Sequence, residues 1–128
     1  MPFNILIVDD SKIVHAMLTQ ALEMTDIELG EIFHAMNGRE GLDLLRRHSV
    51  DLVLSDIHMP EMDGVEMVEQ VRLDESLRSI PIVVISSEGS RKRMEQLREN
   101  GVQYFIRKPF TPEKINESIR QAMGEDYD

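Results

Sequence analysis

Short apolar runs alternate along this chain with longer stretches in which apolar residues recur every three or four positions. An uninterrupted run rich in branched residues is typical of a strand buried on both faces, and the wider spacing is typical of a helix with one buried face. The pattern predicts strands at 5–8, 31–35, 51–55, 82–85 and 104–106. It predicts helices around 13–22, 65–71, 90–99 and 112–123, and a second helix that begins after Asn37 and has its apolar side at 42–45.

The ends of three predicted helices carry recognisable capping residues. Asn37 stands three residues before Glu40, which is the spacing of a capping box with Asn as the cap. Asn100-Gly101 is a typical left-handed stop after the fourth helix. Thr111-Pro112 combines an N-cap with proline at the first helical position. These signals support the predicted positions of the helices.

Strand and helix alternate five times, and this predicts an α/β fold with helices on both faces of a parallel sheet. Right-handed crossovers and five strands favour the flavodoxin-like order 2-1-3-4-5. The chain contains no repeat, low-complexity tract or linker, so we expect residues 1–128 to form one domain. Its acidic end, residues 124–128, is expected to be frayed.

Composition narrows the class of protein. Of 128 residues, 41% are hydrophobic and 30% are charged, an ordinary globular balance. The formal net charge of -10 argues against nucleic acid as the main partner, because such binding relies on cationic side chains. The absence of cysteine excludes disulfides and thiolate chemistry. Without a basic leader or an apolar run of about 20 residues, we expect a soluble, cytoplasmic protein with no membrane insertion.

Carboxylates follow two of the predicted strands. Asp9-Asp10 ends the first strand and Asp56 ends the third. In open α/β sheets, ligands bind beyond the carboxyl ends of the strands where the strand order reverses, here between these two strands. Three carboxylates meeting there would repel one another, so either one takes up a proton or a cation is bound. Oxygen ligands without a His or Cys cluster suit Mg²⁺ best.

Two further strand ends point to the same edge. Ser86-Ser87 follows the fourth strand and Lys108 follows the fifth. Acids, a hydroxyl, an ammonium and an implied Mg²⁺ suit phosphoryl transfer, in which positioning and charge neutralisation do most of the work. A carboxylate can itself be the nucleophile and form an aspartyl phosphate. The chain has no GxxxxGK[ST] loop, so no nucleotide site is expected.

Four motifs in this order resemble those of a known family. They are ILIVDDS at the first strand, DIHMPEMDG at the third, VVISS at the fourth and KPF after the fifth. The chain resembles the receiver domains of two-component response regulators, of the single-domain CheY type, from residue 4 to about residue 123. Each motif is weak by itself, and the four together are highly specific.

The resemblance implies roles for the acids. Asp56 would accept a phosphoryl group from a partner's phosphohistidine. Asp9 and Asp10 would help to hold Mg²⁺, with Asp56 and the main-chain carbonyl of His58 as the remaining protein ligands.

The resemblance also implies roles at the other strand ends. The Ser86 hydroxyl would move to bond the phosphoryl group, and Lys108 would contact its oxygens. Phe105 stands where the family has its switch aromatic, often Tyr. Phe lacks the hydroxyl of Tyr, so a switch step that uses a hydrogen bond from this hydroxyl does not carry over. Movement of the ring between an inward and an outward position does carry over. The bond between Lys108 and Pro109 is expected to be cis.

We therefore expect a stand-alone response regulator, a phosphoacceptor switch that assists its own phosphotransfer and dephosphorylation rather than a conventional enzyme. A sensor histidine kinase or phosphotransfer protein would supply the phosphoryl group. The resemblance implies an output surface on the fourth helix, fifth strand and fifth helix, and both a chemotaxis or motility target and a phosphorelay role stay open. The run Arg91-Lys92-Arg93 is either a solvated helix face or part of that surface.

Two other functions share parts of this pattern, and the sequence argues against each of them. An Mg²⁺-dependent phosphatase with an aspartyl nucleophile usually needs a second Asp two residues later, where this chain has His58. A flavin-binding module needs a hydroxyl-rich phosphate loop after the first strand, where Asp9-Asp10 would repel a phosphate.

Several other polar residues lie near these motifs or elsewhere in the chain. The side chains of His58 and Glu88 are predicted to tune the lifetime of the aspartyl phosphate. Asp63-Gly64 is interpreted as a turn before the third helix. Three histidines share no ligand spacing and are assigned no role: His15, His34 and His48.

Overall fold

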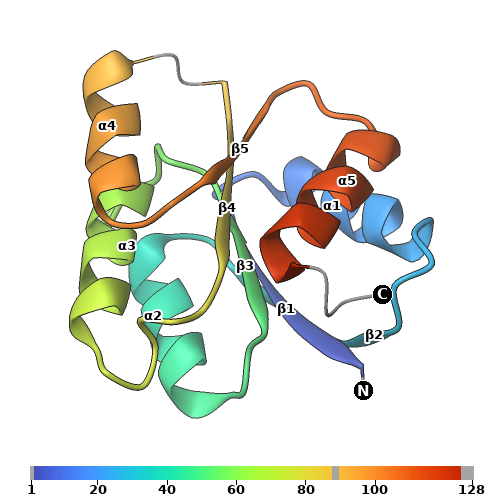
Figure 1. Cartoon of the computed structure of the whole chain (residues 1–128), viewed down its shortest axis with the longest axis horizontal. Coiled ribbons are helices and arrows are strands. Elements are labelled where there is room, and N and C mark those ends of the chain that lie inside the picture. The colour runs from blue at the N-terminus through green and yellow to red at the C-terminus, as the bar shows by residue number, and fades with distance from the viewer. Residues whose placement is uncertain (1, 88–89, 125–128) are drawn as a thin grey trace.

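The computed structural model describes residues 2–87 and 90–124, and within them five strands alternate with five helices. The strands form one parallel sheet in the predicted order β2-β1-β3-β4-β5 (Figure 1). The elements are β1 (Phe3–Val8), α1 (Lys12–Glu23), β2 (Leu29–Ala35), α2 (Gly38–Arg47), β3 (Leu52–Ser55), α3 (Gly64–Leu73), β4 (Ile82–Ser86), α4 (Arg91–Glu99), β5 (Tyr104–Arg107) and α5 (Pro112–Met123).

Helices cover both faces of the sheet. Figure 1 shows α1 and α5 on one side and α2, α3 and α4 on the other. Because successive strand residues point to opposite faces, β1 contributes to both cores. Leu6 and Val8 pack in the core under α2 and α3, whereas Ile5 and Ile7 pack in the core under α1 and α5. Burial on both faces explains why β1, β3 and β4 appear in the sequence as unbroken apolar runs.

Side chains cap the helices much as the sequence predicts. The Asn37 side chain accepts a hydrogen bond from the Glu40 N–H, and the Thr111 hydroxyl accepts one from the Lys114 N–H. The capping box at α2 differs in one detail. The Glu40 carboxylate accepts from the Met36 N–H, one residue before the cap, rather than from the cap itself. The Glu40 side chain therefore bonds to a main-chain N–H just before the helix, where a standard capping box would use the N–H of the cap residue.

The end of α4 is a Schellman motif. Gly101 adopts a φ of 85°, a conformation that glycine adopts without strain. Its N–H bonds to the Arg98 carbonyl at 3.0 Å, and the Val102 N–H bonds to the Leu97 carbonyl at 3.0 Å. Leu97 and Val102 are both buried, which is the hydrophobic contact that accompanies this motif. The predicted left-handed stop is confirmed.

Element boundaries differ from the predictions by one or two residues. The second strand begins at Leu29 rather than residue 31, because Leu29 pairs with Phe3 at the start of β1. The predicted acidic tail lies, from residue 125 on, outside the described residues. No helix within residues 2–87 and 90–124 is both long and apolar enough to span a membrane.

Candidate functional site

Three acidic side chains meet at the carboxyl edge of the sheet. Val8 of β1 pairs with Ser55 of β3. The next residues along the two strands are Asp9 and Asp56, which therefore lie side by side at the strand ends. Asp10 joins them, and one carboxylate oxygen from each of the three lies within 4.8 Å of the others. The convergence that the strand ends predicted is present.

Lys108 brings a positive charge to the same cluster. Its Nζ lies 3.0 Å from Oδ2 of Asp9 and 3.0 Å from Oδ2 of Asp56. Burial alone lowers the pKa of Lys108, but its hydrogen bonds to Asp56 and Asp9 and their charges together raise it above the usual value. Lys108 is therefore a firmly protonated bridge between two strand ends that are distant in sequence.

Asp9 is the most deeply placed of the three acids, and its side chain is only 2% exposed. Burial raises the pKa of Asp9, and this outweighs the lowering by the Ser11 N–H and by Lys108; the charge of Asp56 adds to the rise. Burial thus disfavours the charged form of the Asp9 side chain through a desolvation cost. A bound cation would remove that cost.

The charge and the ligand atoms fit a divalent cation. Three carboxylates and one ammonium leave a formal charge of -2 within the cluster. All the side-chain ligand atoms are hard oxygens, the type of ligand that Mg²⁺ prefers. The three carboxylate oxygens lie within 4.8 Å of one another, so one cation could bind between them.

The backbone around Asp56 is held tightly. The Ile57 N–H donates to Oδ1 of Asp56 at 2.6 Å, and the Gly64 N–H donates to the Ile57 carbonyl at 2.7 Å. A Cβ on Gly64 would lie 2.2 Å from the Asp56 carbonyl oxygen, so only glycine permits this approach. Asp63 caps α3 through the Glu66 N–H. The sequence interpretation of Asp63-Gly64 as a turn missed that Gly64 shapes the site.

The remaining predicted residues lie along the same edge of β4 and β5. Ser86 is the buried last residue of β4, and its carbonyl accepts a hydrogen bond from the Lys108 N–H at 3.2 Å. Phe105 pairs with Val84 and is partly buried, with the guanidinium of Arg98 from α4 5.1 Å from the centre of its ring. The bond between Lys108 and Pro109 is cis, as predicted.

The loop between β3 and α3 carries His58, whose side chain is exposed. This loop is tied to the start of α2, because the Gly38 N–H bonds to the Met62 carbonyl and the Asn37 side chain bonds to Glu61. Glu88, predicted to act with His58, lies outside the described residues. The roles of both side chains stay predictions.

Two histidines that the sequence left without a role lie next to the acidic cluster. Nε2 of the buried His15 is 2.7 Å from the Asp9 carbonyl oxygen, and its Nδ1 is 2.8 Å from Nδ1 of His34. Ligand spacing was the wrong test for these residues. His15 stands three residues before the buried Leu18 and hence on the buried face of α1, which was a usable signal.

The basic run begins α4. Arg91 and Lys92 are exposed, and Arg93 makes an ion pair with Asp63 at 3.3 Å. Only part of the run is therefore a freely solvated face. The ion pair ties the first turn of α4 to the cap of α3, at the end of the loop that begins at Asp56.

Comparisons with known proteins agree with this geometry. A family model described as the response regulator receiver domain matches residues 5–120. The polar-differentiation response regulator DivK of Brucella anthropi is 30% identical over 125 residues, covering 98% of this chain and 99% of the relative. A chemotaxis protein CheY homolog of Campylobacter jejuni is 31% identical over 122 residues, covering 94% and 92% of the two chains.

Solved structures show the same fold. The CheY4 chemotaxis protein of Vibrio cholerae matches with a TM-score of 0.85 at 28% identity, covering 95% of this chain and 99% of that one. A chain from the CheX-CheY-BeF3-Mg+2 complex of Borrelia burgdorferi matches with a TM-score of 0.87 at 28% identity, covering 98% and 92%. That complex contains BeF3 and Mg²⁺.

Proposed function

The chain belongs to the response regulator receiver domain family, and from that premise we propose that it is a phosphorylation-dependent signalling switch with Asp56 as its phosphoacceptor. The observation that carries the proposal is the bridge from Lys108 to Asp9 and Asp56, at 3.0 Å each, beside Asp10. It unites a nucleophilic carboxylate, a cation-binding pair and an ammonium at one edge of the sheet.

The phosphoryl group would come from the phosphohistidine of a sensor histidine kinase or a phosphotransfer protein. An Asp56 oxygen bonds to phosphorus while the phosphorus–nitrogen bond breaks, and the electron pair leaves with the imidazole, which takes a proton. Lys108 stands close enough to bond a phosphoryl oxygen after transfer.

Mg²⁺ would be held by Asp9, Asp10, Asp56 and the main-chain carbonyl of His58. When bound, it supplies neutralisation of the charge on the phosphoryl oxygens. The chain's own contribution is to place the acids, since the Ile57 N–H and the Lys108 ammonium each fix one oxygen of Asp56.

The signal would leave through a protein contact on α4, β5 and α5. Phosphorylation shifts a two-state equilibrium toward the active surface, with the Ser86 hydroxyl moving to the phosphoryl group and Phe105 packing inward. Arg98 and Phe105 already join α4 to β5 at this surface, and Arg91 and Lys92 extend it. The similarity to a chemotaxis CheY homolog supports a chemotaxis or motility target, and a phosphorelay partner is the second candidate.

Intact mass spectrometry tests the proposal. Incubation with a small phosphodonor and Mg²⁺ is expected to add one phosphoryl group to the wild type and none to Asp56→Asn. Asp43→Asn, an exposed acid on α2, is the matched control and should behave like the wild type. No modification of the wild type by the phosphodonor or by phosphohistidine protein, or steady turnover of a free phosphomonoester, would contradict the proposal.

A further inference from the structure

A pair of histidine rings lies directly behind the acidic cluster. His15 on α1 is 7% exposed, and its ring centre lies 4.9 Å from that of His34 on β2. The two Nδ1 atoms are 2.8 Å apart, and Nε2 of His15 is 2.7 Å from the Asp9 carbonyl oxygen. The contacts form a continuous line from the edge strand through the helix to the site.

The chemistry of these atoms assigns the hydrogens. A carbonyl oxygen only accepts hydrogen bonds, so Nε2 of His15 carries the hydrogen that bonds to Asp9. When both rings are neutral, each carries a single hydrogen, so Nδ1 of His15 is an acceptor. His34 must then donate from Nδ1. The buried ring is held in one tautomer by the outer ring.

The bond fixes the peptide between the two acids. The Asp9 carbonyl belongs to the peptide group that joins Asp9 to Asp10, so the carbonyl direction sets where Asp10 starts. The other polar groups of Asp9 are also engaged: its N–H bonds to Ala35, Oδ1 accepts from Ser11, and Oδ2 accepts from Lys108. His15 completes this set.

We propose that His15 is a positioning residue that orients the Asp9–Asp10 peptide, and that His34 holds His15 in the donating tautomer. This inference rests on the proposed function, because it concerns the carboxylates that would hold Mg²⁺. Among the described residues, no third metal-ligating side chain joins the two rings in a cluster. The pair therefore acts through Asp9 rather than as a metal site of its own. Outer contacts of this kind typically change metal affinity 10- to 100-fold.

Matched substitutions separate hydrogen bonding from packing. A glutamine amide can donate from about the position of Nε2, whereas methionine fills similar space without a donor. His15→Met is expected to raise the Mg²⁺ dissociation constant about tenfold in calorimetry, in line with other outer-contact losses. His15→Gln should recover most of the affinity, and the control His48→Met should match the wild type.

Long-range ¹H–¹⁵N NMR of the metal-free wild type at a pH of about 8 gives an independent reading of the two tautomers. We expect the Nε2–H tautomer for His15 and the Nδ1–H tautomer for His34. An Nδ1–H tautomer at His15, or equal Mg²⁺ affinity of wild type and His15→Met, would overturn this inference and leave the proposed function standing. Absence of Mg²⁺ binding by the wild type itself would contradict the proposed function and the positioning role together.

Discussion

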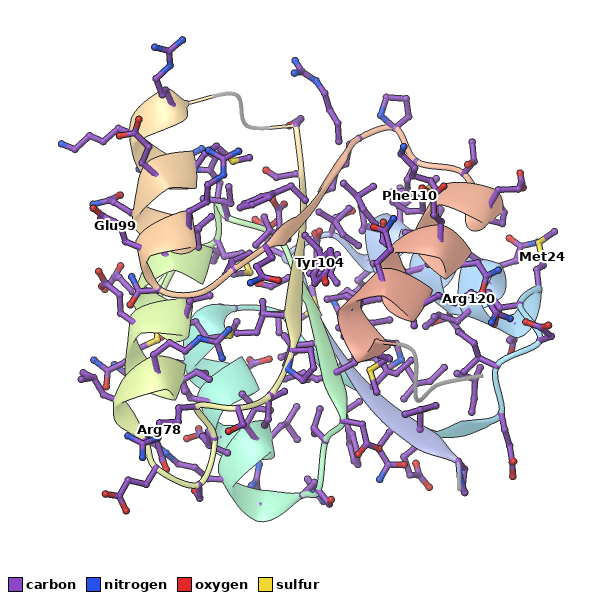
Figure 2. All side chains as sticks on the ribbon, in the orientation of Figure 1. Met24, Arg78, Glu99, Tyr104, Phe110 and Arg120 are labelled. Atoms are coloured by element: carbon purple, nitrogen blue, oxygen red, sulfur yellow. The ribbon has the colours of Figure 1, made fainter. Side chains whose placement is uncertain are left out.

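Charged groups are partly buried at both edges of the sheet, and the two edges use them differently. At the carboxyl edge, Asp9 and Asp56 share the ammonium of Lys108. At the amino edge, the guanidinium of Arg72 in the last turn of α3 bonds only to main-chain carbonyls: Nε to Asn100 at 2.7 Å, and Nη1 to Arg78 and Ile80 at 2.8 and 3.0 Å. Figure 2 shows Arg78 at the lower end of the view and Phe110, which follows β5, toward the upper end.

The two edges differ in how far the charged groups there are neutralised or hydrogen-bonded by the protein itself. The carbonyls that Arg72 bonds lie in the α3–β4 and α4–β5 connections. Its guanidinium therefore holds these two connections together by hydrogen bonds. The acidic cluster keeps a formal charge of -2 after Lys108 is counted, and burial raises the pKa of Asp9. A charged side chain whose hydrogen bonds are all made within the protein has a structural role. A cluster that keeps a net charge is a candidate site for a ligand of opposite charge.

A hollow in the surface lies at the amino edge, away from the acidic cluster. This hollow, of about 550 Å³, lies beside Arg72 and is also lined by Tyr104 and Ala122. It shares no residue with the acidic cluster. The chemistry of converging carboxylates, rather than the size of a hollow, marks the candidate site.

The largest expected effect concerns the backbone of the carboxyl edge rather than its charges. Gly64→Ala should lower the free energy of unfolding by about 3 kcal/mol, because the new Cβ would overlap the Asp56 carbonyl oxygen. Urea denaturation measures this. Glu69→Ala, on the exposed side of the same helix, is the control and should change the free energy of unfolding little. A loss under about 1 kcal/mol would mean that the loop can move away easily.

Arg72→Met tests whether the amino edge is purely structural. It leaves carbonyls without their charged donor and should lower the free energy of unfolding by about 2 kcal/mol. The Mg²⁺ affinity should be unchanged, because Arg72 has no contact with the acids. Arg78→Met is a fitting control, as only the Arg78 carbonyl takes part. Weaker Mg²⁺ binding in Arg72→Met would show that the two edges are coupled.

Lys108→Met should have opposite effects on two properties of the carboxyl edge. Removing its positive charge is expected to tighten Mg²⁺ binding on the order of tenfold. The same change should slow phosphorylation of Asp56, because the phosphoryl oxygens lose a partner. Calorimetry and timed mass spectrometry measure the two quantities. Lys114→Met, on the exposed side of α5, should change neither. Tightened binding with undiminished phosphorylation would separate Lys108 from the transfer step.

Asp9→Asn is expected to give the smallest effect on stability, and the size of this effect depends on pH. Since the folded pKa of Asp9 is raised, the unfolded chain loses this proton first as pH rises above 3.8, and the charged acid then disfavours folding. Without metal, Asp9→Asn should therefore be more stable than the wild type at pH 7, and the gain should vanish below pH 3.8. Thermal melts at the two pH values measure it. Greater stability of the wild type at pH 7 would reverse the assignment.

Local patterns along the chain were enough for the sheet order, for the caps at Asn37, Gly101 and Thr111, and for the meeting of the three acids. Apolar periodicity depends on which faces are buried, and the ends of parallel strands necessarily share one edge. Residues near the ends of β1, β3 and β5 could therefore be placed together before any distance was known. The predicted distribution of roles among Ser86, Lys108 and Phe105 came from the family resemblance.

The tertiary structure decided what depends on close approach between distant segments. The contact of Gly64 with Asp56, the ring pair of His15 and His34, and the carbonyls around Arg72 carry no periodic signal. Figure 2 likewise places Arg120 of α5 near Met24, and Arg120 bonds to Asp26 just beyond α1, a pairing that no spacing rule predicts. Hydrophobic patterning determines which elements form and which faces they bury, whereas single hydrogen bonds and missing Cβ atoms matter only once those elements have packed.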